Sequence, residues 1–272
     1  MPSLDRLLAK RYVQPLREGG SLPAIVDTDS GLFVTKFRGA GQGPKALVAE
    51  LIVAGLATAL DLPVPEIAII DIPPPFGRSE PDPEIQDLLR ASHGTNFGIR
   101  YLDGAFNFEL GAAGHLVSTE FATRLVWLDA LVTNPDRTHR NPNLLVWERK
   151  PWLIDHGAAL YAHHDWARVD EERIRAPFGL IADHVLLASS EDPRAVDEEC
   201  TQRMSEGVVE RILRSVPDEL LEDERVDPDA SRERYASYLH GRLEPPRAFA
   251  EGIEEARKRV LEATPRPLSS RR

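Results

Sequence analysis

The chain has 272 residues, 42% of them hydrophobic and 28% charged, with a formal net charge of -11. This length suits one large domain or two small lobes around a shared cleft, and a core of that size needs no metal or disulfide to hold it together. The acidic balance excludes bulk electrostatic binding to nucleic acid, and the single cysteine excludes an internal disulfide framework and fits a reducing cytoplasm.

The first 60 residues predict a small antiparallel sheet and one long helix. Residues 1–10 lack the apolar core and cleavage site of a secretory signal. Apolar runs separated by glycine-containing turns predict strands over residues 12–16, 24–27 and 32–37. Pro44 suits the first turn of a helix, which the Ala- and Leu-rich run over 45–60 predicts. That run contains Glu50 and is too short to cross a bilayer, so we expect a cytoplasmic protein without a membrane span.

Two more strands are expected around an insertion. An Ile- and Val-rich run predicts a strand over residues 64–72, and another is expected over 95–102. Residues 73–92 combine a proline run with acidic residues and form the expected insertion, with a short helix over 83–91.

The rest of the chain predicts mainly helices. Ser118 can cap a helix that runs through Thr133, with apolar residues at helical spacing. The segments expected after it are a polar loop at 134–142, strands at 143–147 and 152–155 with a turn at 148–151, and helices near 182–188, 197–215, 230–239 and 246–262. Residues 264–272 lack an apolar pattern and are expected to be disordered. This order of elements is typical of the α+β class.

The polar loop and the hairpin after it place two acids and an amide near one point. Asp136 and Asn141 lie in the loop, and the apolar strand at 152–154 runs directly into Asp155. Because the hairpin folds back on the loop, we expect these side chains to converge, with Asn143 as a weaker candidate for the same network. Carboxylate and amide oxygens are the ligands that Mg²⁺ prefers, with phosphate oxygens completing the shell. For the loop alone, an ordinary turn is the alternative, since Asn, Pro and Asp are turn formers.

A lysine and a glutamate are expected to pair in the first part of the chain. Lys36 lies among apolar residues in a predicted strand, and Glu50 lies on the apolar face of the long helix. A carboxylate in that position is costly unless it has a charged partner, and Lys36 is the natural candidate. The alternative is a lysine on a solvated strand face, the commoner fate of lysine.

These residues occur in an order that resembles a known group of kinases. Asp136 and Asn141 lie five residues apart, a hairpin follows, and Asp155 opens an Asp-x-Gly segment. The order is similar to the catalytic loop and metal-binding segment of the protein-kinase superfamily. The local form Asn-x-Asp-Arg-x-x-x-Asn most resembles the HipA-like serine/threonine kinases and the related phosphatidylinositol kinases. The resemblance covers residues 12–188.

The resemblance implies an α+β, bilobal protein-kinase-like fold. An N-lobe over residues 1–102, with a small antiparallel sheet and one long helix, would bind the nucleotide, and a mainly helical C-lobe over 103–263 would carry the catalytic loop. ATP and Mg²⁺ are the implied cofactors. Asp136, Asn141 and Asp155 are then the implied catalytic residues, and the last two of these are the metal ligands.

Nucleotide contacts are implied in the same way. The implied residues are Lys36, Glu50, Gly19, Gly20, Ser21, Arg100, Tyr101 and Leu102. In such kinases the lysine holds the α- and β-phosphates and the glutamate orients it. The glycines at 19–20 lie where a phosphate-covering loop is found, and glycine lets backbone N–H groups approach phosphate. A plain hairpin turn is an equal alternative there. Backbone groups at 100–102 would bond the adenine at the hinge between lobes.

Several positions differ from those of ordinary eukaryotic kinases. No His-Arg-Asp triplet and no Ala-Pro-Glu segment occur, and His156 stands where Phe is usual after the metal-binding aspartate. Arg137 or Arg140 is expected either to stabilise the transferring phosphate or to face solvent, whereas His139 and His156 are expected to be hydrogen-bonded structural residues. The residues at 163–165, two histidines and an aspartate, are expected to form a surface segment, because no third metal ligand is evident.

The expected function is therefore an ATP-dependent kinase that transfers the γ-phosphate of ATP to a hydroxyl group. The expected acceptor is serine or threonine of a protein, and the partners are ATP and an unknown protein or small-molecule acceptor. The alternatives are a pseudokinase or scaffold that binds nucleotide without transfer, and a small-molecule or lipid kinase on the same fold. The acidic balance disfavours binding to anionic membranes.

Overall fold

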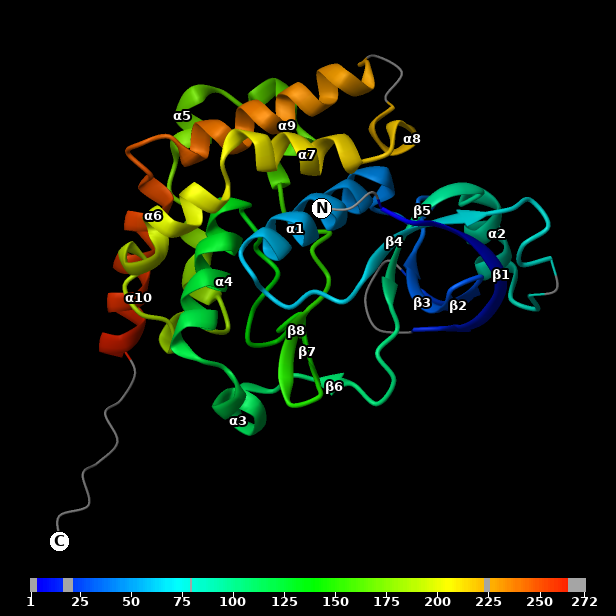
Figure 1. The fold of residues 1–272 in the computed structure, drawn as a ribbon, viewed down its shortest axis with the longest axis horizontal. Coiled ribbons are helices and arrows are strands. Elements are labelled where there is room, and N and C mark those ends of the chain that lie inside the picture. Colours follow the sequence, from blue (N-terminus) through cyan, green and yellow to red (C-terminus); the bar gives the residue numbers. More distant parts are fainter. Residues whose placement is uncertain (1–3, 17–21, 79, 223–225, 264–272) are drawn as a thin grey trace, which may run out of the picture.

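The computed structural model describes residues 4–16, 22–78, 80–222 and 226–263. A closed barrel of five strands lies at one end of the molecule and most of the helices lie at the other, with α1 (Gly43–Ala59) between them (Figure 1). The barrel strands follow the order β1-β2-β3-β5-β4. Their bounds are β1 Arg6–Pro15, β2 Ala24–Thr28, β3 Gly31–Lys36, β4 Ile67–Ile72 and β5 Gly94–Arg100.

A parallel strand pair closes this barrel, which differs from the expected all-antiparallel sheet. β1 pairs with β4 in parallel, with Leu7 opposite Ile70, and the other neighbouring strands pair antiparallel. β1 also begins at Arg6, well before the expected strand at 12–16. Since Leu7 is buried and Leu8 is half exposed, two adjacent leucines hide the alternation that marks a half-buried strand.

The central helix α1 is buried on almost its whole circumference. Every residue from 46 to 57 is buried, including Glu50. It contacts β5 on the barrel side and the helices α4 (Thr119–Leu131), α7 (Glu206–Ser215) and α8 (Asp218–Leu221) on the other. Apolar residues all round a helix are expected in such a position. The predicted helix and the place of Pro44 in its first turn are confirmed.

A second, small sheet follows the barrel, in the order β6-β7-β8. Its strands are β6 Phe106–Asn107, β7 Leu144–Trp147 and β8 Lys150–Leu153. The turn between β7 and β8 has two residues, Glu148 and Arg149, with φ values of 48° and 61°. Positive φ at both positions is typical of a type I′ hairpin turn. The expected four-residue turn at 148–151 is therefore too long, since Lys150 and Pro151 already lie in β8.

Helices and short turns make up most of the remaining chain. The other helices are α2 Pro83–Ala91, α3 Leu110–Ala113, α5 Glu171–Arg175, α6 Arg194–Arg203, α9 Pro228–Leu243 and α10 Ala248–Ala263, and the 3-10 turns are η1 Gly114–Leu116, η2 Tyr161–His164, η3 Trp166–Arg168, η4 Gly179–Asp183 and η5 Leu187–Ser189. The single helix expected over 197–215 is thus two helices, α6 and α7. Within the described ranges, each helix falls short of the length and apolarity that crossing a membrane requires.

The prediction of a helix over 182–188 is wrong, because local hydrogen bonds prevent a helix there. The Leu186 N–H donates to Nδ1 of His184 at 3.0 Å, and the Val185 N–H donates to the Arg137 carbonyl at 3.1 Å. These backbone donors are therefore bound outside any helix, and the chain forms only the end of η4 and the start of η5.

α4 carries the polar loop at its end and is fixed at both termini. At its start, the Ser118 hydroxyl accepts from the Phe121 N–H at 3.1 Å, as the sequence predicts. At its end, the buried guanidinium of Arg242 donates to the Leu131 and Ala130 carbonyls at 2.7 and 2.9 Å. The same guanidinium bonds two carbonyls near the end of α5. A cation at the carboxyl end of a helix also complements the helix dipole.

We expect Arg242→Met to destabilise the protein, because the bound carbonyls lose their donor while staying buried. The free energy of unfolding should fall by about 3 kcal/mol or more, which corresponds to a Tm about 6–12 °C lower. Arg234→Met on the exposed face of α9 is the matched control and should leave the Tm nearly unchanged. Equal melting curves for the two variants would contradict the capping role of Arg242.

Candidate functional site

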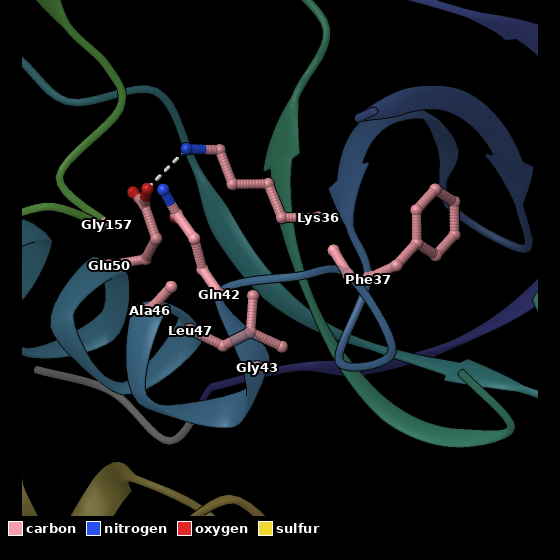
Figure 2. Close-up of a pocket in the computed structure, with 9 residues that line it drawn as sticks. Lys36, Phe37, Gln42, Gly43, Ala46, Leu47, Glu50 and Gly157 are labelled. Atoms are coloured by element: carbon pink, nitrogen blue, oxygen red, sulfur yellow. Dashed lines mark hydrogen bonds and ion pairs between the residues drawn. The ribbon is translucent and has the colours of Figure 1, made fainter. Parts of the chain in front are cut away.

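The expected lysine–glutamate pair forms, and Asp155 joins it. Nζ of Lys36, the last residue of β3, lies 2.5 Å from Oε1 of Glu50 and 2.5 Å from Oδ1 of Asp155. Figure 2 shows the Lys36 and Glu50 side chains pointing toward one another from β3 and α1. The Glu50 side chain is 1% exposed and that of Asp155 is 45% exposed. One cation therefore holds a buried and an accessible carboxylate together.

Burial and charge act in opposite directions on the pKa values of these three groups. Burial alone lowers the pKa of Lys36, but the two carboxylates beside it raise it to about 12, so the ammonium stays charged. Burial also raises the pKa of Glu50, against the pull of Lys36. For Asp155, burial is outweighed by the Lys36 ammonium, which lowers the pKa of that carboxyl.

The chain around Asp155 is shaped to bring it against α1. Asp155 itself has a φ of 56°, a left-handed conformation that turns the chain sharply out of β8. The next residue, His156, donates its backbone N–H to Oε1 of Glu50 at 2.9 Å. At Gly157, a Cβ would lie only 3.2 Å from the same oxygen, so a residue without a side chain suits this close approach. The Asp-x-Gly pattern thus has a geometric reason here.

A hollow lies beside this cluster, at the start of α1. Its lining residues are Lys36, Phe37, Ala40, Gln42, Gly43, Ala46, Leu47, Glu50 and Gly157. In Figure 2 the Gln42 side chain extends from the loop before α1 toward the Glu50 carboxylate. The glycine-containing loop at 39–43 therefore lines the hollow that leads to the cluster.

The polar loop after α4 is ordered around Asp136. Its Oδ2 accepts hydrogen bonds from the side-chain amides of Asn141 at 2.8 Å and Asn143 at 3.1 Å. Both asparagines donate through Nδ2, which leaves their Oδ1 atoms without a hydrogen-bond partner in the described chain. Asn143, the weaker candidate from sequence, is as much part of this network as Asn141. Its φ of 48° suits asparagine, which tolerates the left-handed region.

Arg137 joins the polar loop to His156, the residue after Asp155, and the sequence did not indicate this contact. Neither expected position for this side chain is right, because the guanidinium is fully buried and bonds Oδ2 of Asp129 at 2.6 Å. It also donates to the Asn143 carbonyl at 2.5 Å and to Nδ1 of His156 at 3.1 Å. An arginine in a polar loop looks exposed in a sequence, and its signal would have been Asp129, an acid within the apolar helix α4. Arg140 is exposed.

The carboxylate of Asp129 is fully paired. Its Oδ1 accepts from the Asn134 side chain at 2.9 Å and its Oδ2 also accepts from Nε2 of His184 at 3.0 Å. Nδ1 of His184 accepts a backbone N–H, so the neutral ring carries its proton on Nε2. Burial raises the pKa of Asp129, but the charge of Arg137 and the bond from His184 lower it below its usual range.

His156 is a buried, hydrogen-bonded residue, as expected. Because a guanidinium can only donate, Nδ1 of His156 must accept from Arg137, and the ring is neutral. Burial and then the charge of Arg137 lower the pKa of His156 to about 3. His139 is exposed.

The oxygens left free in this arrangement suit a divalent cation. Oδ1 of Asn141 and Oδ2 of Asp155 have no hydrogen-bond partner among the residues that the structure describes. Both groups are fixed through their other atom, by Asp136 and by Lys36. Hard oxygen donors of the carboxylate and amide type fit Mg²⁺, and Lys36 supplies a cation for phosphate oxygens. The donor chemistry thus fits both implied cofactors.

The implied adenine-binding residues lie where the chain leaves the barrel. The backbone N–H groups of Arg100 and Tyr101 are already bound, to the carbonyls of Glu66 at 2.7 Å and Leu32 at 3.0 Å. The carbonyl of Leu102 accepts from a backbone N–H three residues later. The Leu102 N–H is therefore the free donor of this segment in the described chain. Gly19, Gly20 and Ser21 lie outside the described residues.

The prediction that residues 163–165 form a surface segment is wrong for His163. His163 is fully buried, with Nδ1 3.1 Å from the Tyr235 hydroxyl and Nε2 3.2 Å from Nε2 of His164. Burial, then His164 and Lys45, lower the pKa of His163 to about 3. In the described part of the chain no three His, Cys, Asp or Glu side chains cluster as a metal site would require.

The buried histidines predict an acid-sensitive fold. Both His156 and His163 have folded-state pKa values of about 3 against an ordinary value of 6.5, so below pH 6.5 the unfolded chain binds protons that the folded protein cannot. Each should lower the free energy of unfolding by up to about 1.4 kcal/mol per pH unit as the pH falls from 6.5. Urea unfolding at pH 7.5, 6.5 and 5.5 measures this slope.

His163→Gln should reduce that slope by about one proton's contribution, whereas His139→Gln, at an exposed site, should leave it unchanged. A stability that stays constant between pH 7.5 and 5.5 would show that the buried histidines titrate normally.

Comparison with known proteins bears on the family and the fold of the chain. No curated protein matches the chain. The chain is similar in structure to a Helicobacter pylori proinflammatory kinase, CtkA, with a TM-score of 0.58 and 11% identity over 95% of this chain and 98% of that one. At this identity the likeness shows the fold alone, which is a mixed α+β fold like that of a kinase. A family model described as HipA-like kinase matches residues 12–236, so the chain belongs to the HipA-like kinase family, as the polar loop and Asp155 segment indicated.

Proposed function

We propose that this protein is an ATP-dependent kinase that moves the γ-phosphate of ATP to a hydroxyl group, with serine or threonine of a protein as the acceptor. The observation that carries the proposal is the contact of Lys36 with both Glu50 and Asp155. Lys36 and Glu50 come from the successive elements β3 and α1, whereas Asp155 lies 119 residues after Lys36, and Arg137 ties the polar loop of Asp136 to the segment of Asp155. The family supports a kinase.

Lys36 and Glu50 act on the nucleotide. The Lys36 ammonium, charged at neutral pH, binds the α- and β-phosphates, and Glu50 fixes its position from α1. Because Glu50 also accepts the His156 N–H, the phosphate-binding lysine and the Asp155 segment are positioned by one carboxylate. Fixed charges cost no reorganisation when phosphoryl transfer occurs, which is why positioning and charge neutralisation dominate this chemistry.

The polar loop acts on the acceptor. Asp136 orients the attacking hydroxyl and accepts its proton, while Asn141 and Asn143 hold the carboxylate through Oδ2 and leave Oδ1 free for that contact. Asn141 and Asp155 would hold Mg²⁺ through their free oxygens. When bound, Mg²⁺ neutralises phosphate charge. Arg137 holds the loop near Asp155, since its guanidinium bonds both the Asn143 carbonyl and Nδ1 of His156.

In this proposal the molecule is bilobal. Residues 1–102, with the barrel and α1, form the nucleotide-binding lobe, and residues 103–263 form the lobe with the catalytic loop. The segment at 73–92, with α2, is an insertion in the first lobe. The free Leu102 N–H is the hinge donor for adenine, because the two donors before it are engaged in the barrel.

The test is phosphate transfer by the wild-type protein and by two variants, Asp136→Asn and Asp155→Asn. Each removes a charge at nearly constant shape, and we expect transfer from labelled ATP in the presence of Mg²⁺ to fall by about 100-fold or more. Incubation alone and with cell lysate shows whether label reaches the protein itself, other proteins or small molecules. Asp183→Asn, at an exposed site, is the matched control.

Label on serine or threonine of proteins supports the proposal. Full transfer by folded Asp136→Asn and Asp155→Asn would remove both residues from the mechanism. Label on small molecules or lipids alone would change the acceptor class. Binding of ATP, seen as a raised Tm, without any transfer would identify a pseudokinase.

A further inference from the structure

The segment that follows Asp155 is fastened to the first turns of α1. Nζ of Lys45 donates to the carbonyl of His163 at 2.6 Å. Closer to Asp155, Gly157 packs against Ala46, with 3.5 Å between a Cβ placed there and the Ala46 Cβ. The His156 N–H donates to Glu50. Lys45, Ala46 and Glu50 of α1 therefore hold the chain from 156 to 163.

The other side of the same segment is fixed to the helical part of the protein. The Leu160 N–H donates to the Val132 carbonyl at the end of α4 at 2.7 Å. Nδ1 of His163 lies 3.1 Å from the Tyr235 hydroxyl on α9. The segment thus bridges α1 and the helices α4 and α9. On the α1 side Lys45 makes a cationic contact with it, and the Glu50 carboxylate makes an anionic one.

Residues 139–188 contain no serine and no threonine, and their single hydroxyl group is that of Tyr161. In protein kinases the corresponding loop is often ordered by a phosphorylated residue that pairs with a cation. Phosphoserine and phosphothreonine are impossible here. Lys45, on the helix that carries Glu50, bonds a backbone carbonyl of this segment without any modification.

We propose that Lys45 is a positioning residue that couples α1 to the segment at 156–164 and keeps Glu50 against Lys36, so that the enzyme needs no phosphorylation of this segment. This inference rests on the proposed kinase function. Lys45 lies five residues before Glu50, about 7.5 Å along the helix axis. A displacement of the segment is therefore transmitted to the Glu50 end of the same helix, and Lys45 acts through Glu50 without touching the reacting atoms.

The test compares Lys45→Ala with Lys45→Arg, and Lys10→Ala on the exposed side of β1 is the matched control. For Lys45→Ala we expect kcat to fall about tenfold, the loss of one charged hydrogen bond, with KM for ATP within about twofold of wild type. Lys45→Arg, which keeps the charge and a donor, should recover most of kcat. An unchanged kcat in Lys45→Ala, or a raised KM at unchanged kcat, would overturn the proposal.

Hydrogen exchange gives a readout that does not depend on activity. The amides of Leu160 and His163 are protected by backbone hydrogen bonds, and in Lys45→Ala they should exchange faster, together with amides around Glu50. Unchanged exchange would refute the coupling even in a protein that transfers no phosphate. A wild type without any transfer would refute the proposed function and leave the exchange result to decide the coupling.

Mass spectrometry of the active wild type should find no phosphate within 155–173. Tyr161→Phe should keep full activity, since its side chain is 61% exposed and the lysine contact does not involve it. An inactive Tyr161→Phe, or activity that requires phosphate at Tyr161, would contradict the inference.

Discussion

The buried ion pair between Arg137 and Asp129 is the constraint on which the site depends. Taking both charges out of water is costly, and the structure offsets that cost by bonding every side of the pair, with Asn134 and His184 on the carboxylate and Asn143 among the acceptors of the guanidinium. Removing one partner of such a pair typically costs about 3–5 kcal/mol. The loop that carries Asp136 therefore cannot move independently of α4 without exposing this pair.

A single residue joins that pair to the lysine cluster. His156 accepts from Arg137 through its ring and donates its backbone N–H to Glu50, so the two charged groups share one position in the chain. A phenylalanine, usual at this place in related kinases, could not accept from the guanidinium. The contact with Arg137 thus accounts for the histidine at this position, and burial together with the charge of Arg137 lowers the pKa of the ring.

The sequence neighbours of each residue indicated most of the candidate site. The features that they did not indicate depend on contacts between residues far apart in the chain. Glu50 in an apolar helix indicated a cationic partner, and Asp155 after an apolar strand indicated a metal ligand. Both could be predicted from the residues next to them in the chain. Arg137 could not, because nothing next to it in the chain shows that Asp129 lies opposite. The parallel closure of the barrel by β1 and β4 depends on residues far apart, and the burial of His163 depends on Tyr235, so neither could be read from a local pattern.

Closure of the barrel has a consequence for association. A strand at the edge of an open sheet presents unpaired backbone groups, to which another chain can add a strand. β1 pairs with β4 over Arg6–Leu8 and with β2 over Ala9–Pro15, whereas β2, β3 and β5 each have a paired strand on both sides, so strand addition is blocked at those three strands. Unpaired strand edges in the described chain lie along Ala9–Pro15 of β1 and in the small sheet at β6 and β8, and at β8 the Leu153 N–H already donates to the Pro63 carbonyl. Addition of a strand from another chain to the native protein is therefore confined to these few edges.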